Sequence, residues 1–329
     1  MSSEKYSSVL VLEGLSTTVN IKDSSPDVQL IPSPRPDLLR SVNHGDFQDD
    51  LTKDGFAVIK GVIPPERVTQ YREKAKDWLL SFGTELDFED NKTWIEKKKN
   101  LPVQNKIRTF AGHYELLVSF DSLNVTLPNR PDAPTRQPWE HVDQSPLRRG
   151  LHCVQGIICL SPSGPEDGGL VVWPGSPAHN EEFFNSRPDK DSWLRLKASY
   201  FFPTEQLDWF RARGMGPHKV CAEPGDLILW DSRTIHYGSD ATPRSNQIRT
   251  AIYAAYTPAS MANPEQLALK KQVYGRWGGT THWLHDHVVV RNTHVMLEDG
   301  TRDPRDRDQP LELPQLNDKL LKLVGAKPY

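Results

Sequence analysis

The sequence has few cysteines, no long hydrophobic run and no marked excess of charge of either sign. Its three cysteines, Cys153, Cys159 and Cys221, cannot all pair, so a disulfide-stabilised secreted domain is not expected. No apolar stretch approaches the roughly 18 residues that a membrane-spanning helix needs. The first residues also lack a basic start followed by an apolar core. We therefore expect a cytoplasmic protein with no membrane partner.

The balance of charges bears on the kind of partner. The chain has 40 Lys and Arg residues and 43 Asp and Glu residues, a formal net charge of -3 at pH 7. A chain with this balance lacks the positive field that nucleic-acid binding normally needs. We expect no nucleic-acid partner, and the sequence does not predict the oligomeric state.

Apolar residues occur in short runs, divided by turns that draw on 27 prolines and 21 glycines. Short runs rich in Val, Ile, Tyr and Phe between such turns are typical of β-strands. The runs lie at 55–63, 113–120, 139–143, 151–160, 168–175, 225–231 and 248–257. From residue 113 onward they do not alternate regularly with helices, so an antiparallel sandwich or barrel is favoured over a doubly wound sheet.

Helices are expected on both sides of this β-rich region. After Pro64, apolar residues recur at steps of three and four up to Phe82, which predicts a helix with one buried stripe. Asn263 can cap a helix over 264–275. A short amphipathic helix is predicted within 313–325.

The chain is predicted to contain one main domain. An irregular arm rich in Ser and Pro covers 1–48, the β-domain with helical insertions covers 49–285, and a C-terminal extension covers 286–329. Two segments, 85–112 and 181–220, are expected to cover the cavity and to set specificity.

Three side chains, two on one predicted strand and one shortly after another, are expected to carry the chemistry. His141 and Asp143 belong to the triplet His-Val-Asp, and the strand period of two places them on one face. His236 follows a second predicted strand. Two imidazoles and one carboxylate on one side of an octahedral ion leave three positions open, as in non-haem Fe(II) oxygenases. We expect these residues to bind Fe(II), with two positions open to an oxoacid and one to O2.

An oxoacid bound in this way needs an anchor for its far carboxylate. A guanidinium is suited to this because it makes two parallel charge-assisted hydrogen bonds. Arg249 begins the predicted strand at 248–257 and can return antiparallel to the strand that leads to His236. Arg244 is the alternative, but it lies within a Pro-Arg-Ser-Asn turn, so Arg249 is favoured.

These residues resemble the phytanoyl-CoA dioxygenase-like family of Fe(II)/2-oxoglutarate-dependent oxygenases, particularly its fungal branch. The resemblance covers roughly residues 50–285 and rests on GFAVIKGVIPPERV, HVD, GGLVVWPGS and GDLILWDSRTIHYG followed by Arg249. It implies a mainly β fold with flanking helices around a double-stranded β-helix (jelly-roll, cupin-like) core. It also implies His141, Asp143 and His236 as iron ligands and Arg249 as the anchor of 2-oxoglutarate. The best-known members place the arginine slightly closer to the distal histidine, which keeps Arg244 open.

The resemblance extends to two further cosubstrate contacts. Gln155 matches a family side chain on the strand after the HxD triplet that contacts 2-oxoglutarate. Ser239, shortly after His236, is the candidate for a hydrogen bond to the same carboxylate as the arginine.

The implied activity is oxidation of a small organic metabolite by hydroxylation, desaturation or oxidative cyclisation. An amino acid or a secondary-metabolite intermediate would fit as substrate. Because Asp143 fills the position that related halogenases leave empty for halide, halogenation is not favoured. Two alternatives stay open: an oxygenase acting on an acyl-CoA or a macromolecule, and a non-catalytic β-helix protein that binds a ligand.

Two other histidine-containing patterns are weaker candidates. A second HxD triplet, His44-Gly45-Asp46, lies in the predicted arm and is not expected to bind metal. The run His-Trp-Leu-His-Asp-His at 282–287 is interpreted as solvated or substrate-lining histidines rather than as a second metal site.

Overall fold

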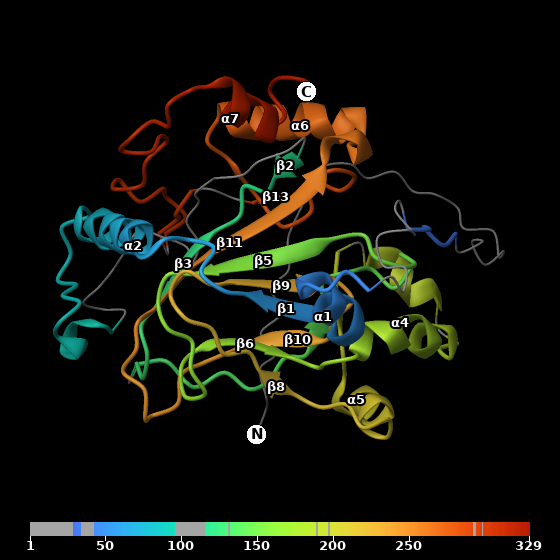
Figure 1. The fold of residues 1–329 in the computed structure, drawn as a ribbon. Coiled ribbons are helices and arrows are strands. Elements are labelled where there is room, and N and C mark those ends of the chain that lie inside the picture. Colours follow the sequence, from blue (N-terminus) through green and yellow to red (C-terminus); the bar gives the residue numbers. More distant parts are fainter. Residues whose placement is uncertain are drawn as a thin grey trace.

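The computed structural model describes residues 29–33, 43–95, 116–130, 132–188, 190–196, 198–291, 294–297 and 299–329. Most of the predicted arm, most of the segment at 85–112 and the start of the predicted strand at 113–120 lie outside these residues. In the described part, two antiparallel sheets are accompanied by helices at the periphery (Figure 1).

The larger sheet has the strand order β1-β9-β5-β11-β2, and β3 also pairs with β11. Its strands are β1 (Phe56–Ile59), β2 (Leu116–Val118), β3 (Leu123–Thr126), β5 (Val154–Cys159), β9 (Leu227–Asp231) and β11 (Arg249–Pro258). The smaller sheet has the order β7-β4-β10-β6-β8. Its strands are β4 (His141–Val142), β6 (Gly169–Val172), β7 (Tyr200–Phe201), β8 (His218–Lys219) and β10 (His236–Ser239).

The order of these strands along the chain is that of a double-stranded β-helix. Apart from the two-residue strands β7 and β8, the chain from β4 to β11 passes back and forth between the sheets. The predicted fold class is therefore confirmed. A separate pair, β12 (Gly279–Thr280) and β13 (Val290–Arg291), follows the last of these strands.

The core lies between the two sheets. Ile157, Ile228 and Ala251 of the larger sheet pack with Leu170 and Val172 of the smaller sheet. On the opposite face, the larger sheet is covered by α2 (Pro65–Leu80), which contributes two buried residues to a second apolar cluster. Both faces of the larger sheet are thus packed against apolar neighbours, which explains why its strands are mostly apolar.

The predicted helices are found close to their expected bounds. Helix α2 follows Pro64 and ends before Gly83, and α6 (Pro264–Gly275) is capped by Asn263, whose side chain accepts a hydrogen bond from the Glu265 amide. A short helix, α7 (Asp318–Leu323), lies within 313–325 and packs beside α6 (Figure 1). No helix of the described residues is both long and apolar enough to cross a membrane.

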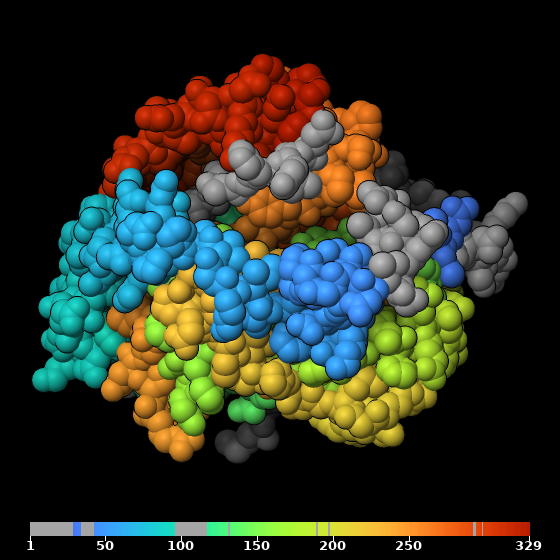
Figure 2. All heavy atoms as spheres, in the orientation of Figure 1, coloured from blue at the N-terminus to red at the C-terminus, as the bar shows by residue number. Residues whose placement is uncertain are grey.

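The remaining helices were only partly anticipated. The expected insertion at 181–220 contains the end of α4 (Ser176–Asn185), η2 (Lys190–Arg195) and α5 (Thr204–Arg211), but it also contributes the edge strands β7 and β8. Helix α1 (Phe47–Asp54) was not predicted, and η1 (Asn91–Thr93) and η3 (Ala259–Met261) are single turns. Helices α1 and α2 (blue) and the C-terminal segment (red) lie at the surface in Figure 2.

Candidate metal centre and cosubstrate site

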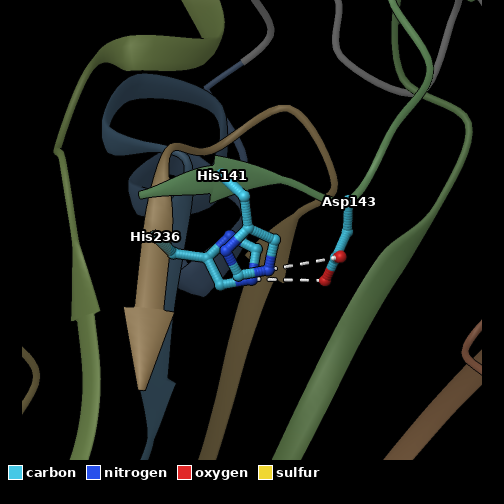
Figure 3. A group of neighbouring side chains, drawn as sticks. All are labelled: His141, Asp143 and His236. Carbon is cyan, nitrogen blue, oxygen red and sulfur yellow. Dashed lines mark ion pairs between the residues drawn. The ribbon is translucent and has the colours of Figure 1, made fainter. Parts of the chain in front are cut away.

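The two histidines of the predicted triad meet because β4 and β10 are neighbouring strands. His141 and His236 are directly paired in the antiparallel register, and their ring centroids lie 4.3 Å apart. Both residues are buried. Asp143 follows β4, and its carboxylate faces the edges of both imidazoles (Figure 3). Strand pairing thus brings together residues that are far apart in the sequence.

The ligand atoms of the triad are close enough to share one ion. His141 Nε2 lies 3.5 Å from Asp143 Oδ1, and His236 Nε2 lies 3.2 Å from Asp143 Oδ2. Neighbouring ligands of an octahedral ion with bonds near 2.1 Å lie roughly 3 Å apart. One ligand atom from each of the three residues lies within 4.8 Å of the other two. Among the described residues, this is the one group of three or more His, Cys, Asp or Glu residues whose ligand atoms lie so close together.

The protonation states of the two imidazoles favour the binding of a cation. Nδ1 of His141 lies 3.2 Å from the Trp139 carbonyl, and Nδ1 of His236 lies 2.9 Å from the Thr234 carbonyl. Because a carbonyl only accepts, each Nδ1 carries the proton and each Nε2 presents a lone pair toward Asp143. Two lone pairs facing a carboxylate repel it unless a positive charge lies between them. The donor set therefore fits a divalent metal ion.

The acid–base properties of the triad agree with this interpretation. Burial and the neighbouring His236 lower the pKa of His141, which keeps its imidazole neutral. Burial by itself raises the pKa of Asp143, but nearby His282, the largest of the opposing influences, helps to hold this pKa well below its usual range. The carboxylate is therefore ionised at neutral pH, as metal binding requires.

Asp143 has two further contacts that the sequence did not reveal. Gln155, on β5 of the larger sheet, donates from Nε2 to Asp143 Oδ2 at 3.0 Å. His282 Nε2 lies 3.3 Å from the main-chain oxygen of Asp143. The predicted contact of Gln155 with a cosubstrate stays a prediction, because the side chain is observed on the aspartate. His282 comes from the histidine-rich run, whose place beside the triad depends on long-range packing.

Arg249 is a cation without a carboxylate partner in the described structure. It begins β11 on the same face as Ala251 and Tyr253, which pack between the two sheets. Its guanidinium donates to Asn124 Oδ1 at 2.8 Å and to the Tyr253 hydroxyl at 3.3 Å. The interior between the sheets therefore contains a fixed guanidinium that can accept an anionic group.

The alternative arginine has a different environment. The side chain of Arg244 is 78% exposed and forms an ion pair with Glu166. It lies in the turn before β11 and has its charge partner already. The structure thus places Arg249, and not Arg244, beside the interior.

Ser239 is not brought to the triad. Strand alternation places it on the face of β10 opposite to His236. Its hydroxyl donates to the Gly169 carbonyl at 3.2 Å and accepts from Lys219 Nζ at 3.1 Å. Burial and the charge of Arg249 lower the pKa of Lys219 to about 8. The predicted contact of Ser239 with the far carboxylate of 2-oxoglutarate stays a prediction.

Partly exposed aromatic rings border the metal centre. Trp139 and Phe201 stack on the His141 ring, with centroids 4.4 and 5.2 Å away. Phe201 is the cross-strand neighbour of His141 and is 57% exposed, while Trp139 is 38% exposed. The insertion that was expected to cover the cavity therefore contributes an aromatic side chain next to a candidate ligand.

The second HxD triplet has a structural role. Asp46 caps α1 by accepting a hydrogen bond from the Gln48 amide. The main-chain amides of His44 and Gly45 donate to Asp49. This exposed segment thus forms the start of a helix, and its residues are not in the metal-compatible group.

Comparison with known proteins identifies the family. The family model described as phytanoyl-CoA dioxygenase (PhyH) matches residues 51–251. Ava biosynthesis cluster protein O of Aspergillus versicolor is 31% identical over 303 residues, which cover 83% of this chain and 97% of the relative. The chain belongs to the phytanoyl-CoA dioxygenase family. The predicted enzyme class, an Fe(II)/2-oxoglutarate-dependent dioxygenase, is confirmed with it.

Solved structures show more distant similarity. The α-ketoglutarate-dependent carbocyclase SnoK from nogalamycin biosynthesis has a TM-score of 0.41 and 16% identity, covering 68% of this chain and 87% of SnoK. EctD from S. alaskensis with bound Fe has a TM-score of 0.42 and 15% identity, covering 72% of this chain and 83% of EctD. Similarity this distant says nothing specific about the present site.

Proposed function

We propose that this protein oxidises a small organic molecule with Fe(II) held by His141, Asp143 and His236 and with 2-oxoglutarate anchored by Arg249. The observation that carries the proposal is the convergence of two Nε2 lone pairs and an ionised carboxylate within 4.8 Å. Bound Fe(II) and 2-oxoglutarate together supply the activation of O2 that oxidation of an unactivated carbon needs.

The chain's own residues hold and orient these groups. The main-chain carbonyls of residues 139 and 234 fix the two imidazoles, so each Nε2 points at the metal position. Asn124 and Tyr253 hold the guanidinium of Arg249, which is suited to the far carboxylate of 2-oxoglutarate. Apolar side chains, among them Ile157, Leu170 and Ile228, line the small cavity beside Arg249.

The substrate is proposed to be a secondary-metabolite intermediate. Support comes from the relative, whose name places it in a biosynthesis cluster, and from the aromatic rings of Trp139 and Phe201 beside the metal ligands. Hydroxylation, desaturation and oxidative cyclisation are all compatible with this site. A cytoplasmic location, the absence of a nucleic-acid partner and a single domain over 49–285 remain predictions.

Anaerobic titration of the purified protein with Fe(II) and 2-oxoglutarate tests the proposal. We expect a visible charge-transfer band that saturates at one equivalent of iron and is absent in a His236→Ala variant. A folded wild-type protein that forms no band would contradict the cofactor assignment. Screening metabolites for succinate release then separates an enzyme from a protein that binds its ligand without turnover.

A further inference from the structure

The carboxylate of Asp143 is held by a residue of the larger sheet, opposite to the sheet that carries the two histidines. Gln155 lies on β5, whereas the two histidines lie on β4 and β10 of the smaller sheet. Its amide reaches across to Oδ2 of Asp143 at 3.0 Å. An ionised carboxylate only accepts hydrogen bonds, so the group that faces it must be the NH2 of the amide.

Gln155 is well fixed for this contact. Its backbone is paired on both sides, with Trp230 of β9 and with Ala255 of β11. The residue is 6% exposed, so neighbouring side chains restrict its movement. On the other side of the aspartate, His282 holds the main-chain oxygen. Asp143 is therefore constrained at its backbone and at one of its two carboxylate oxygens.

The constraint on Asp143 matters because the metal ion has a limited number of coordination positions. An octahedral ion has six positions, of which the triad fills three and leaves three for the oxoacid and O2. A carboxylate with both oxygens free can bind through both, which would fill a fourth position. A hydrogen bond to one oxygen opposes this, and a neutral donor does so without cancelling the negative charge that binds the metal.

We propose that Gln155 is a positioning residue that holds Oδ2 of Asp143, so that this carboxylate binds iron through its other oxygen alone. The inference rests on the proposed function, since it assumes that the triad binds iron. It assigns to Gln155 a role toward the metal ligand that is separate from any contact with 2-oxoglutarate.

The test replaces Gln155 by methionine, which has a similar length and no amide. Mn(II), a spectroscopic substitute for Fe(II), is titrated into the full-length protein, and free Mn(II) is measured by EPR. Loss of an outer hydrogen bond to a metal ligand typically costs 10–100-fold in affinity, so we expect a rise of this size in the Kd. We also expect a displaced or weakened charge-transfer band in the anaerobic complex with Fe(II) and 2-oxoglutarate, because the coordination of iron changes.

Gln266→Met is the matched control. Gln266 lies on α6 and accepts a hydrogen bond from the Val288 amide, so the same exchange removes one hydrogen bond without touching the triad. Its Kd for Mn(II) and its band are expected to equal those of wild type. Thermal melting checks that each variant folds, and Gln155→Ala is the second variant if the methionine is not accommodated.

The outcomes separate this inference from the proposed function. A wild-type protein that binds no Mn(II) or Fe(II) refutes the metal site itself. A wild-type protein that binds metal, together with a folded Gln155 variant that has the same Kd and the same band, overturns only the role of Gln155.

Discussion

Replacing Arg249 by methionine should remove the anchor of 2-oxoglutarate while leaving the metal site intact. The guanidinium is held by Asn124 and Tyr253 and has no carboxylate partner in the described part of the chain. Two charge-assisted hydrogen bonds to a carboxylate contribute together about 3 kcal/mol. At about 1.4 kcal/mol for each tenfold change, the Kd for 2-oxoglutarate should rise roughly 100-fold.

The assay is an anaerobic titration of the Fe(II)-loaded protein, followed by the charge-transfer band. 2-Oxobutyrate provides an internal comparison, because it keeps the chelating oxoacid but lacks the distal carboxylate. Its affinity should be equal in wild type and in the Arg249→Met variant. Affinity for Mn(II) alone should also be unchanged, which shows that the variant retains the triad.

Arg244→Met is the control for this experiment. Its side chain is 78% exposed and paired with Glu166, so we expect 2-oxoglutarate affinity within about twofold of wild type. If Arg249→Met binds 2-oxoglutarate as wild type does, Arg249 is not the anchor. A large loss in Arg244→Met instead would reassign the anchor to the turn.

Three further predictions concern the fold. Only Cys221 should react with a thiol reagent in the native protein, because the other two cysteines are buried and burial raises their pKa; all three should react in denaturant. Gly225→Ala should lower the free energy of unfolding by about 3 kcal/mol, because φ of Gly225 is +97° and the new Cβ would lie 2.5 Å from the Ile63 main-chain oxygen. Gly216→Ala is the control, because a Cβ there meets open space and should not lower the free energy of unfolding in this way. Burial raises the pKa of Asp226, but Lys60 and two backbone amides outweigh this and lower it. The Asp226 carboxylate binds protons more weakly in the folded state than in the unfolded chain. Asp226→Asn should therefore lower the free energy of unfolding by about 2 kcal/mol at pH 7. This difference between wild type and variant should shrink below a pH of about 4 and vanish once the pH has fallen through the lowered pKa. Urea unfolding of the wild type and of Asp226→Asn at pH 7 and pH 3 measures this difference.

Local patterns in the sequence were sufficient to predict most of the longer strands and the three residues of the triad. The alternation in His-Val-Asp places His141 and Asp143 on one face, and the turn before β9 indicates where His236 follows. These signals depend on residues close in the chain. The register that pairs His141 with His236 depends on the assembly of two sheets, and no local pattern specifies it.

The contacts that sequence reasoning missed are long-range. The sequence led us to expect Gln155 to contact 2-oxoglutarate, whereas its observed contact with Asp143 depends on how the two sheets face each other. His282 reaches Asp143 from beyond the β-domain's last long strand. Ser239, three positions after His236, lies on the opposite face of β10, and its predicted contact with the cosubstrate stays a prediction.

Short elements were also difficult to predict. Strands β7 and β8 have two residues each, too few for a periodic pattern, although β7 places Phe201 beside His141. The predicted strand at 139–143 is reduced to two residues, because Asp143 leaves the sheet and turns toward β5.

In the proposed site, one ferrous ion is bound by residues of β4, β10 and the segment after β4. A crystal structure of the protein prepared with Fe(II) under anaerobic conditions, with anomalous data on both sides of the iron absorption edge, tests it most directly. We expect a single anomalous peak at about 2.1 Å from Nε2 of His141, Nε2 of His236 and one carboxylate oxygen of Asp143. A peak at another place, or none at this position with iron in excess, would contradict the account.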